Sequence, residues 1–234
     1  MNKEKRDYLL PASILVAAIL ISGSIVYLVG SRSTGGVSDV GKEDSDQLAT
    51  IKETSNLKTS DRDVILGDPK APVTLIEFGD YQCPFCGRFF EQVEIPLREN
   101  YIKSGKVKMV FMNFSFLGPE STAAAEAAEC AKDQKQFWAF HDAIYETEIK
   151  DGRENNGNLN RDLFLKLASE LKLDNSSFTS CFDSKKYARQ VEEDNNNARA
   201  LGVNSTPTTF VNSQKLIGAL PYAQFKAAID SILK

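Results

Sequence analysis

The sequence predicts an α/β fold in which a block of helices interrupts a core built from strands. Two short apolar runs at 73–78 and 107–111 have the length and composition of buried strands, and two more short strands are expected at 206–211 and 214–217. The long stretch between the two pairs carries helical patterns instead. With 234 residues, 42% of them hydrophobic and 26% charged, the chain can bury one substantial core.

Residues 1–30 differ from the rest of the chain. From Leu9 to Val29 nearly all residues are apolar, and no charged residue lies between Asp7 and Arg32. A helix of about 20 such residues, at ~1.5 Å per residue, spans the hydrocarbon core of a bilayer. Basic residues are denser before this run than after it, which predicts a cytoplasmic N-terminus, a transmembrane signal anchor and an extracytoplasmic remainder. The alternative is a protein secreted after cleavage, but Ser22-Gly23-Ser24 is a poor cleavage site.

The segment that follows the apolar run predicts a flexible extracytoplasmic linker. Residues 31–63 are rich in Ser, Thr, Gly, acidic residues and Lys, and they carry too few large apolar side chains to fold alone. Folding is therefore expected to begin near Val64. The expected parts of the folded domain are a first α/β part, a helical insertion and a second α/β part, at 64–118, 119–202 and 203–234.

The first α/β part reads as strand, helix and strand. The turn-rich residues 67–72 lead into the strand at 73–78. A helix is expected from the cysteine motif at 83–86 to about Lys103, with a bend near Pro96, because proline removes a backbone donor inside a helix. A right-handed parallel crossover then joins the two strands.

The remaining helices are assigned by composition and by periodicity. Phe137, Phe140, His141 and Ile144 fall on one helical face. His141 is therefore predicted to be a packed helix residue with a hydrogen-bond partner rather than a catalytic group. Its neighbour Trp138 is predicted to lie in the core. Further helices are expected at 121–132, 160–171, 185–201 and 223–233.

The pair of cysteines in Cys83-Pro-Phe-Cys86 predicts a thiol–disulfide exchange site. The motif follows a buried strand and opens a helix, where unpaired N–H groups and the helix dipole stabilise a thiolate on Cys83. Cys86 lies within reach to close a disulfide with it. Pro84 suits the first helical turn, where a missing N–H group costs nothing.

Two other kinds of site fit the sequence poorly. A structural zinc site needs a second cysteine pair or two histidines, whereas Cys130, Cys181 and His141 are scattered singly. The net charge of −4 provides no basic surface for nucleic acid. We therefore expect no metal, no nucleic acid and no cofactor other than the Cys83–Cys86 disulfide.

The other two cysteines are expected to form a structural disulfide. Outside the cytoplasm disulfides form and persist, and four cysteines allow three pairings. If Cys83 and Cys86 pair in the motif, Cys130 and Cys181 remain, and the loop of about 50 residues that they close contributes about 4 kcal/mol in the chain-entropy model. Two separate buried thiols are the alternative.

Several motifs, in this order and spacing, resemble the DsbA-like branch of the thioredoxin superfamily, particularly the membrane-anchored or secreted bacterial oxidases of the BdbD type. The motifs are GDPKAPV at 67–73, EFGDYQCPFC at 77–86, FWAFHD at 137–142, ALGV at 200–203 and STPTTF at 205–210. The resemblance runs from about Ile65 to the C-terminus. It implies a thioredoxin fold interrupted by a helical domain, in agreement with the elements assigned above.

The resemblance also implies roles for individual residues. Cys83 would be the nucleophile that forms a mixed disulfide with the substrate, and Cys86 the resolving cysteine. Thr206-Pro207 resembles the cis-proline loop that faces the cysteines and pairs with an extended substrate; a trans proline entering an edge strand is the alternative. Glu77 matches the position of a buried acid that relays protons for Cys86, although a solvated acid at a strand end is equally compatible with the sequence.

The function implied by the resemblance is a membrane-anchored oxidase that introduces disulfides into exported proteins. A quinone-linked membrane oxidase of the DsbB or VKOR type would recycle it, and the chain would act as a monomer. Phe85 stands where the strongest oxidases of this family carry histidine, which predicts a less oxidising centre. The alternatives are a reductase or isomerase that uses the same site, and a non-enzymatic metallochaperone or peptide-binding module. The absence of clustered Met or His near Cys83 disfavours copper binding.

Overall fold

The computed structural model describes residues 57 and 59–234. The predicted signal anchor at 1–30 and most of the predicted linker at 31–63 lie outside these residues. Within the part of the chain that is described, no helix is both long enough and apolar enough to cross a bilayer.

Four strands form one mixed sheet in the order β2-β1-β3-β4. β1 (Val73–Gly79) pairs in parallel with β2 (Val107–Asn113), so the predicted crossover is present. β3 (Thr208–Val211) pairs antiparallel with β1 and with β4 (Gln214–Ile217). This order places β1 at the centre of the sheet, and the cysteine motif follows directly from its carboxyl end.

Successive side chains of β1 point to opposite faces of the sheet, as expected for a strand that is covered on both sides. Val73 and Leu75 pack against the helix that follows the cysteines and against the C-terminal helix. Ile76 and Phe78 pack on the opposite face, in a cluster that includes Ala198 of the last insertion helix. Glu77 therefore shares the face of Val73 and Leu75.

The helix after the cysteines runs without interruption, but its pitch changes around Pro96. It begins as α2 (Pro84–Phe89) and continues as a π-helical turn (Phe90–Glu94), a short α3 (Ile95–Leu97) and a second π-helical turn (Arg98–Ile102). The sequence predicts a bend near Pro96, and the structure has wide turns on both sides of this residue. These turns accommodate a residue that cannot donate the usual backbone hydrogen bond.

Five helices separate β2 from β3: α4 (Pro119–Lys132), α5 (Phe137–Asp151), α6 (Arg161–Glu170), α7 (Asn175–Asp183) and α8 (Ala188–Ala200). The Asn160 side chain caps α6 by accepting from the Leu163 N–H group, as the sequence predicts. The sequence analysis missed α7, which the Asp174 side chain caps by accepting from the Ser177 N–H group. The chain ends with α9 (Tyr222–Ile232).

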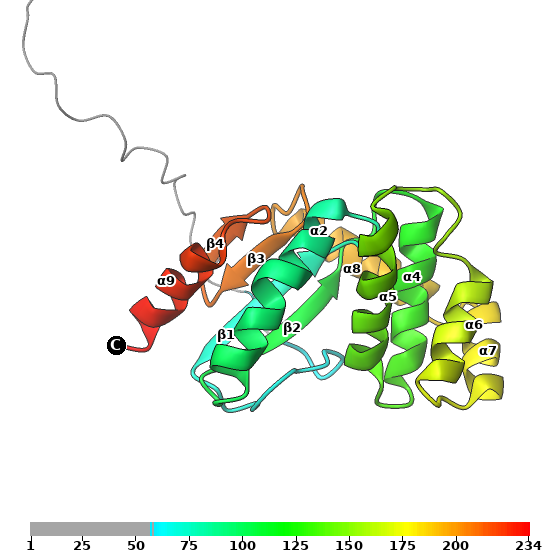
Figure 1. Cartoon of the computed structure of the whole chain (residues 1–234), viewed down its shortest axis with the longest axis horizontal. Helices are drawn as coiled ribbons and strands as arrows, with labels where there is room; N and C mark the ends of the chain where they lie inside the picture. Colours follow the sequence, from blue (N-terminus) through cyan, green and yellow to red (C-terminus); the bar gives the residue numbers. More distant parts are fainter. Residues whose placement is uncertain (1–56, 58) are drawn as a thin grey trace, which may run out of the picture. The chain divides into compact units, whose positions relative to one another are not determined.

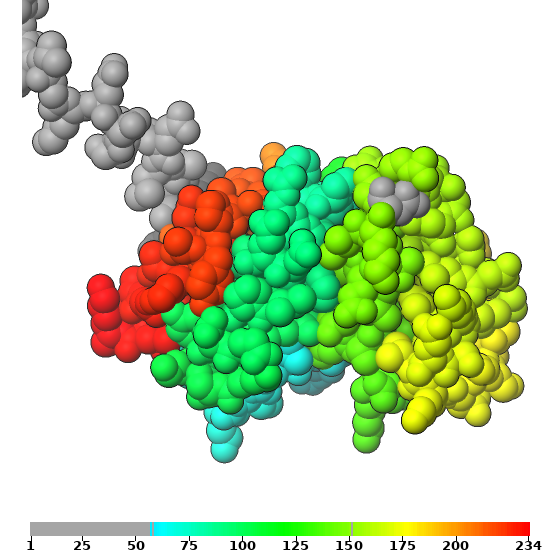
Figure 2. Space-filling view, in the orientation of Figure 1, coloured from blue at the N-terminus to red at the C-terminus, as the bar shows by residue number. Residues whose placement is uncertain are grey.

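Helices cover both faces of the sheet. α2 and α9 lie on one face and α8 passes behind the other, while α4 to α7 gather beside β2 (Figure 1). On the surface, α2 and its continuation cross the face between α9 in red and α5 in yellow-green (Figure 2). The cysteine motif therefore lies where the sheet, α2 and the helical insertion meet.

One disulfide joins two helices of the insertion. Cys130 of α4 and Cys181 of α7 are bonded with an S–S distance of 2.00 Å and a Cα–Cα distance of 5.9 Å. Both side chains are buried among the apolar residues of the insertion. The alternative of two separate thiols does not describe this structure.

Candidate active site

The two remaining cysteines lie at the start of α2 and carry free thiols. Cys83 is the residue that caps the helix N-terminus, and Pro84 occupies the first turn. The Cys83 side chain is 6% exposed, whereas that of Cys86, one turn further, is completely buried. Phe85 between them is 52% exposed. Only the first sulfur is therefore near the surface.

The two thiols have different pKa values because their surroundings differ. The pKa of Cys83 falls from 9.0 to about 6, chiefly because the Cys86 thiol donates a hydrogen bond to its thiolate; Thr206 and the N–H groups of Phe85 and Cys86 add to this effect and together outweigh burial. Burial raises the pKa of Cys86 well above its usual value, and the neighbouring Cys83 sulfur raises it further. Near neutral pH the pair thus consists of a Cys83 thiolate and a Cys86 thiol.

We expect alkylation of the reduced protein to rise with pH through a midpoint near 6 and then to level off, because the thiolate is the reactive form of Cys83. In parallel, the reduced fold gains stability as the pH rises from about 6 towards 9, since the unfolded thiol is still protonated there. Iodoacetamide labelling between pH 4 and 10 measures the midpoint, with Cys83→Ser as the control for reaction at Cys86. A midpoint near 9 would contradict the expectation.

The loop before β3 faces the cysteines. The Thr206–Pro207 peptide bond is cis, and the Thr206 carbonyl oxygen lies 3.5 Å from the Cys83 sulfur. The Pro207 carbonyl oxygen accepts a hydrogen bond from the Gly218 N–H group, which ties the loop to the end of β4. The two predicted parts of the site, 123 residues apart in sequence, are therefore in contact.

Glu77 lies in β1 beneath the cysteines and is completely buried. Neither of its carboxyl oxygens has a hydrogen-bond partner among the described residues. Burial raises the pKa of Glu77 well above its usual value, and the charges of Glu94 and Cys83 raise it further, against the smaller opposing effect of Arg98. A buried carboxyl with a raised pKa keeps its proton to a higher pH than usual, as a group that relays protons must.

We expect Glu77→Gln to stabilise the protein increasingly as the pH rises above 4.5. The native carboxyl holds its proton above the pH at which the unfolded one loses it, so the wild type loses stability from pH 4.5 up to the native pKa, and the variant does not. Urea unfolding at pH 4.5 and 7.5 measures this difference. An equal difference at both pH values would show that the native pKa of Glu77 is not raised.

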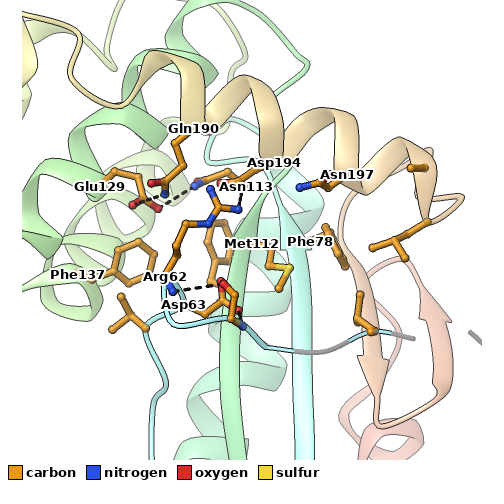
Figure 3. Close-up of a pocket in the computed structure, with 16 residues that line it drawn as sticks. Arg62, Asp63, Phe78, Met112, Asn113, Glu129, Phe137, Gln190, Asp194 and Asn197 are labelled. Carbon is orange, nitrogen blue, oxygen red and sulfur yellow. Dashed lines mark hydrogen bonds and ion pairs between the residues drawn. The ribbon is translucent and has the colours of Figure 1, made fainter. Parts of the chain in front are cut away.

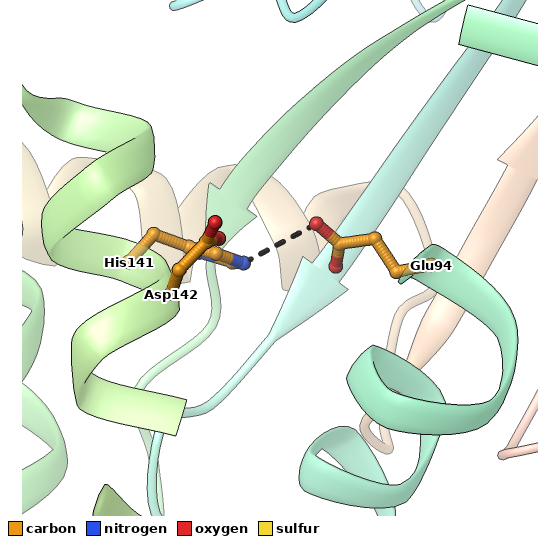
Figure 4. A group of neighbouring side chains, drawn as sticks. All are labelled: Glu94, His141 and Asp142. Carbon is orange, nitrogen blue, oxygen red and sulfur yellow. Dashed lines mark ion pairs between the residues drawn. The ribbon is translucent and has the colours of Figure 1, made fainter. Parts of the chain in front are cut away.

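A buried charged cluster, which the sequence analysis did not predict, lies between α5 and the continuation of α2 (Figure 4). Nε2 of His141 is 3.5 Å from Oε1 of Glu94, and Nδ1 of His141 is 3.1 Å from the Tyr81 hydroxyl. Arg98 donates to both carboxylate oxygens of Asp142 at 2.7 Å and also contacts Glu94. Burial alone would raise the pKa of Glu94, but His141 and Arg98 outweigh it and lower the pKa. Because the Arg98 guanidinium already supplies the cation, the cluster is a poor site for a divalent metal.

Asp80 fixes the loop that carries the cysteines. Its buried carboxylate accepts hydrogen bonds from the N–H groups of Gln82, Phe116 and Leu117, at 2.9–3.1 Å. Its carbonyl oxygen accepts from the Cys83 N–H group at 3.0 Å. The sequence analysis quoted Asp80 within the motif but gave it no role, since two of its partners, Phe116 and Leu117, lie more than 30 residues further along the chain.

A cavity of about 360 Å³ lies beside β2, beneath α8 (Figure 3). Glu129 accepts hydrogen bonds there from the side chains of Asn113 and Gln190. Burial raises the pKa of Asp194 to about 6, with a further contribution from the charge of Glu129. Neither cysteine of the motif and no residue of the cis-proline loop lines this cavity, so it is distinct from the exchange site.

The chain matches known proteins over the whole described domain. The thioredoxin family model matches residues 59–231. A probable disulfide bond formation protein D of Bacillus anthracis is 31% identical over 223 residues, covering 94% of this chain and 93% of that protein. The disulfide bond formation protein D of Bacillus subtilis is 32% identical over 173 residues, covering 73% and 77% of the two chains.

Solved structures of the same type share the fold. The crystal structure of oxidised BdbD from Bacillus subtilis matches with a TM-score of 0.67 and 31% identity, over 74% of this chain and 93% of that one. The α-DsbA1 protein of Wolbachia pipientis matches with a TM-score of 0.67 and 26% identity, over 75% and 93%. The predicted thioredoxin fold is therefore confirmed, and the chain belongs to the thioredoxin family as a DsbA-like protein-disulfide oxidoreductase of the BdbD type.

Proposed function

We propose that the protein oxidises pairs of thiols in exported proteins outside the cytoplasm, with the Cys83–Cys86 disulfide as the oxidant. The observation that carries this proposal is the low pKa of Cys83, about 6, beside a buried Cys86. Stabilising the Cys83 thiolate stabilises the reduced protein, and this makes the disulfide form a stronger oxidant.

The proposed reaction is two successive thiol–disulfide exchanges. A client thiolate attacks the sulfur of Cys83, the Cys83–Cys86 bond breaks, and Cys86 leaves with the electron pair and takes up a proton. A second client thiolate then attacks the client sulfur of the mixed disulfide, and Cys83 leaves as a thiolate. The client gains a disulfide and loses two electrons and two protons in total. The buried Glu77 is the group proposed to supply or remove the proton of Cys86.

The lowered pKa of Cys83 determines how much the reduced protein is stabilised and how far the reduction potential rises. At pH 7, one unit above a pKa of about 6, ionisation of Cys83 stabilises the reduced protein by about 1.4 kcal/mol. For a two-electron couple this raises the reduction potential by about 30 mV. Phe85 provides no cation to stabilise the thiolate further, so we expect a moderately oxidising centre.

The reduction potential tests the direction of electron flow. The full chain, solubilised in detergent, is equilibrated in glutathione buffers, and the fraction of Cys83–Cys86 disulfide is measured. We expect a value between about −120 and −180 mV, in the range of protein oxidases. A value near about −270 mV would instead favour a reductase that receives electrons through the membrane. The absence of any two-electron transition would leave a non-enzymatic peptide-binding or metallochaperone module.

The membrane location is proposed from the sequence. An uncleaved helix at Leu9–Val29 would hold the domain at the outer face of the membrane, near a quinone-linked oxidase of the DsbB or VKOR type that accepts its electrons. Separating membranes from soluble protein and treating intact cells with protease tests this arrangement. Recovery of the chain in the soluble fraction, with a new N-terminus near Ser24, would favour the secreted form.

A further inference from the structure

An exposed cleft of about 400 Å³ opens beside the cis-proline loop. One wall comes from the segment after β2 and contains Phe114 and Phe116. The other wall comes from the end of α8 and the residues after it, and contains Arg199 and 202–204. The exchange reaction described above uses none of these residues.

Both walls of the cleft are connected to Cys83, one through hydrogen bonds of Asp80 and the other through the chain that leads to Thr206. The Phe116 N–H group donates to the Asp80 carboxylate at 2.9 Å, and the Asp80 carbonyl oxygen accepts from the Cys83 N–H group at 3.0 Å. On the other wall, Asn204 precedes Thr206 by two residues, so their Cα atoms are at most about 7.6 Å apart. The Thr206 carbonyl oxygen is 3.5 Å from the Cys83 sulfur. The cleft therefore lies close to the point where a client cysteine reacts.

The side chains of the cleft suit an aromatic ring. The rings of Phe114 and Phe116 lie 4.8 Å apart at 37°. Phe114 is 3% exposed, but Phe116 is 42% exposed, so part of its ring is open to solvent. The Arg199 guanidinium lies 5.6 Å from the centre of the Phe114 ring, and none of the described residues that line the cleft is acidic. A third ring could stack on Phe116 and meet the Arg199 cation, two contacts that aromatic side chains favour.

We propose that this cleft binds an aromatic side chain of the client, located within three residues of the reacting cysteine, and that Phe116 and Arg199 set the preference of the protein for such clients. An extended chain advances ~3.3 Å per residue, so three residues reach about 10 Å from the cysteine, which exceeds the upper limit of about 7.6 Å between the Cα atoms of Thr206 and Asn204. This inference rests on the proposed function only in that the client is a thiol substrate.

Single-turnover reduction of the oxidised full chain by synthetic dithiol peptides tests the inference. One peptide series carries tyrosine at each position from three residues before to three residues after the first cysteine, and a reference peptide carries alanine at all of them. We expect tyrosine at one or two positions to lower the half-saturating concentration about tenfold, while the limiting rate stays the same, because the ring contributes to binding and not to the exchange step.

Substitutions in the cleft locate the effect. In Phe116→Ala and Arg199→Ala, the ratio of half-saturating concentrations between the alanine and tyrosine peptides should fall towards one. Phe116→Leu, which keeps an apolar side chain without a ring, should give an intermediate ratio. Ile232→Ala is the matched control, since it truncates an exposed apolar residue on α9 and should keep the ratio of the wild type.

Several results would overturn the inference. These are the absence of any tyrosine preference in the wild type, a preference that survives both alanine variants, and a stronger preference for aspartate than for tyrosine at the same position. A preference abolished by Ile217→Ala, at the exposed end of β4, would place the ring elsewhere and would also refute it. Failure of the proposed function is distinguishable, because even the alanine peptide would then fail to reduce the protein.

Discussion

Cys83→Ser is expected to lower the rate of disulfide transfer to any dithiol client by a factor of about 10³ or more. A serine hydroxyl cannot form a disulfide, and Cys86 cannot replace Cys83, because it is completely buried and burial raises its pKa well above the usual value. The assay is oxidation of a reduced model protein by the variant after exposure to glutathione disulfide. Activity near that of the wild type would contradict the assignment of Cys83 as the nucleophile.

The matched variant, Cys86→Ser, should behave differently. It retains the Cys83 thiolate but cannot complete the exchange, so a mixed disulfide between Cys83 and the client should accumulate. A Cys86→Ala variant, unlike the serine variant, has no side chain that donates to the Cys83 sulfur, the largest cause of the low pKa of Cys83, so its midpoint for alkylation should rise above 6. Non-reducing electrophoresis and mass spectrometry identify the trapped species.

Removing the structural disulfide in Cys130→Ala/Cys181→Ala is expected to destabilise the domain by about 4 kcal/mol. The crosslink joins residues 51 apart in the chain, and a closed loop of that size constrains the unfolded state by about this amount. For a domain of this size, each kcal/mol lowers Tm by about 2–4 °C, so Tm should fall by roughly 8–16 °C. Urea unfolding and calorimetry measure both quantities.

The active-site pair offers a control for this experiment. Cys83→Ala/Cys86→Ala also removes two cysteines, but the disulfide that they form closes only a four-residue loop, for which the chain-entropy model gives about 2 kcal/mol, half of the value for the Cys130–Cys181 loop. If both double variants lose the same stability, loop closure is not the reason that the Cys130–Cys181 bond stabilises the fold.

The features that sequence analysis predicted best are those with local signals. Cys83 caps the helix whose first turn contains Pro84 and Cys86, so the three residues lie within four positions of the sequence, and the strand before them has a clear apolar run. α7 was missed because its sequence, NSSFTSCFD, contains few strong helix formers. Tertiary contacts stabilise it instead, through burial of Phe178 and Cys181 and the bond to α4.

The buried cluster around His141 could be predicted only in part, because it depends on contacts between distant segments. The sequence predicts a packed histidine with a hydrogen-bond partner, and the structure provides that partner in Tyr81. Glu94 lies beside His141 only because α5 packs against the continuation of α2. The spacing of residues along either helix does not predict how the two helices pack. Contacts between buried polar side chains of distant segments are therefore the part of the site that required a structure.

The order of the elements along the chain has a consequence for synthesis. The cysteines follow β1, whereas Thr206 and Pro207 come only after the whole helical insertion. A chain that emerges from its N-terminus first therefore presents both thiols before the loop that contacts Cys83 exists. During that interval the Cys83 sulfur lacks its Thr206 contact, and β1 is not yet paired with β3. The nascent chain thus carries the reactive groups early, and the complete exchange site forms last.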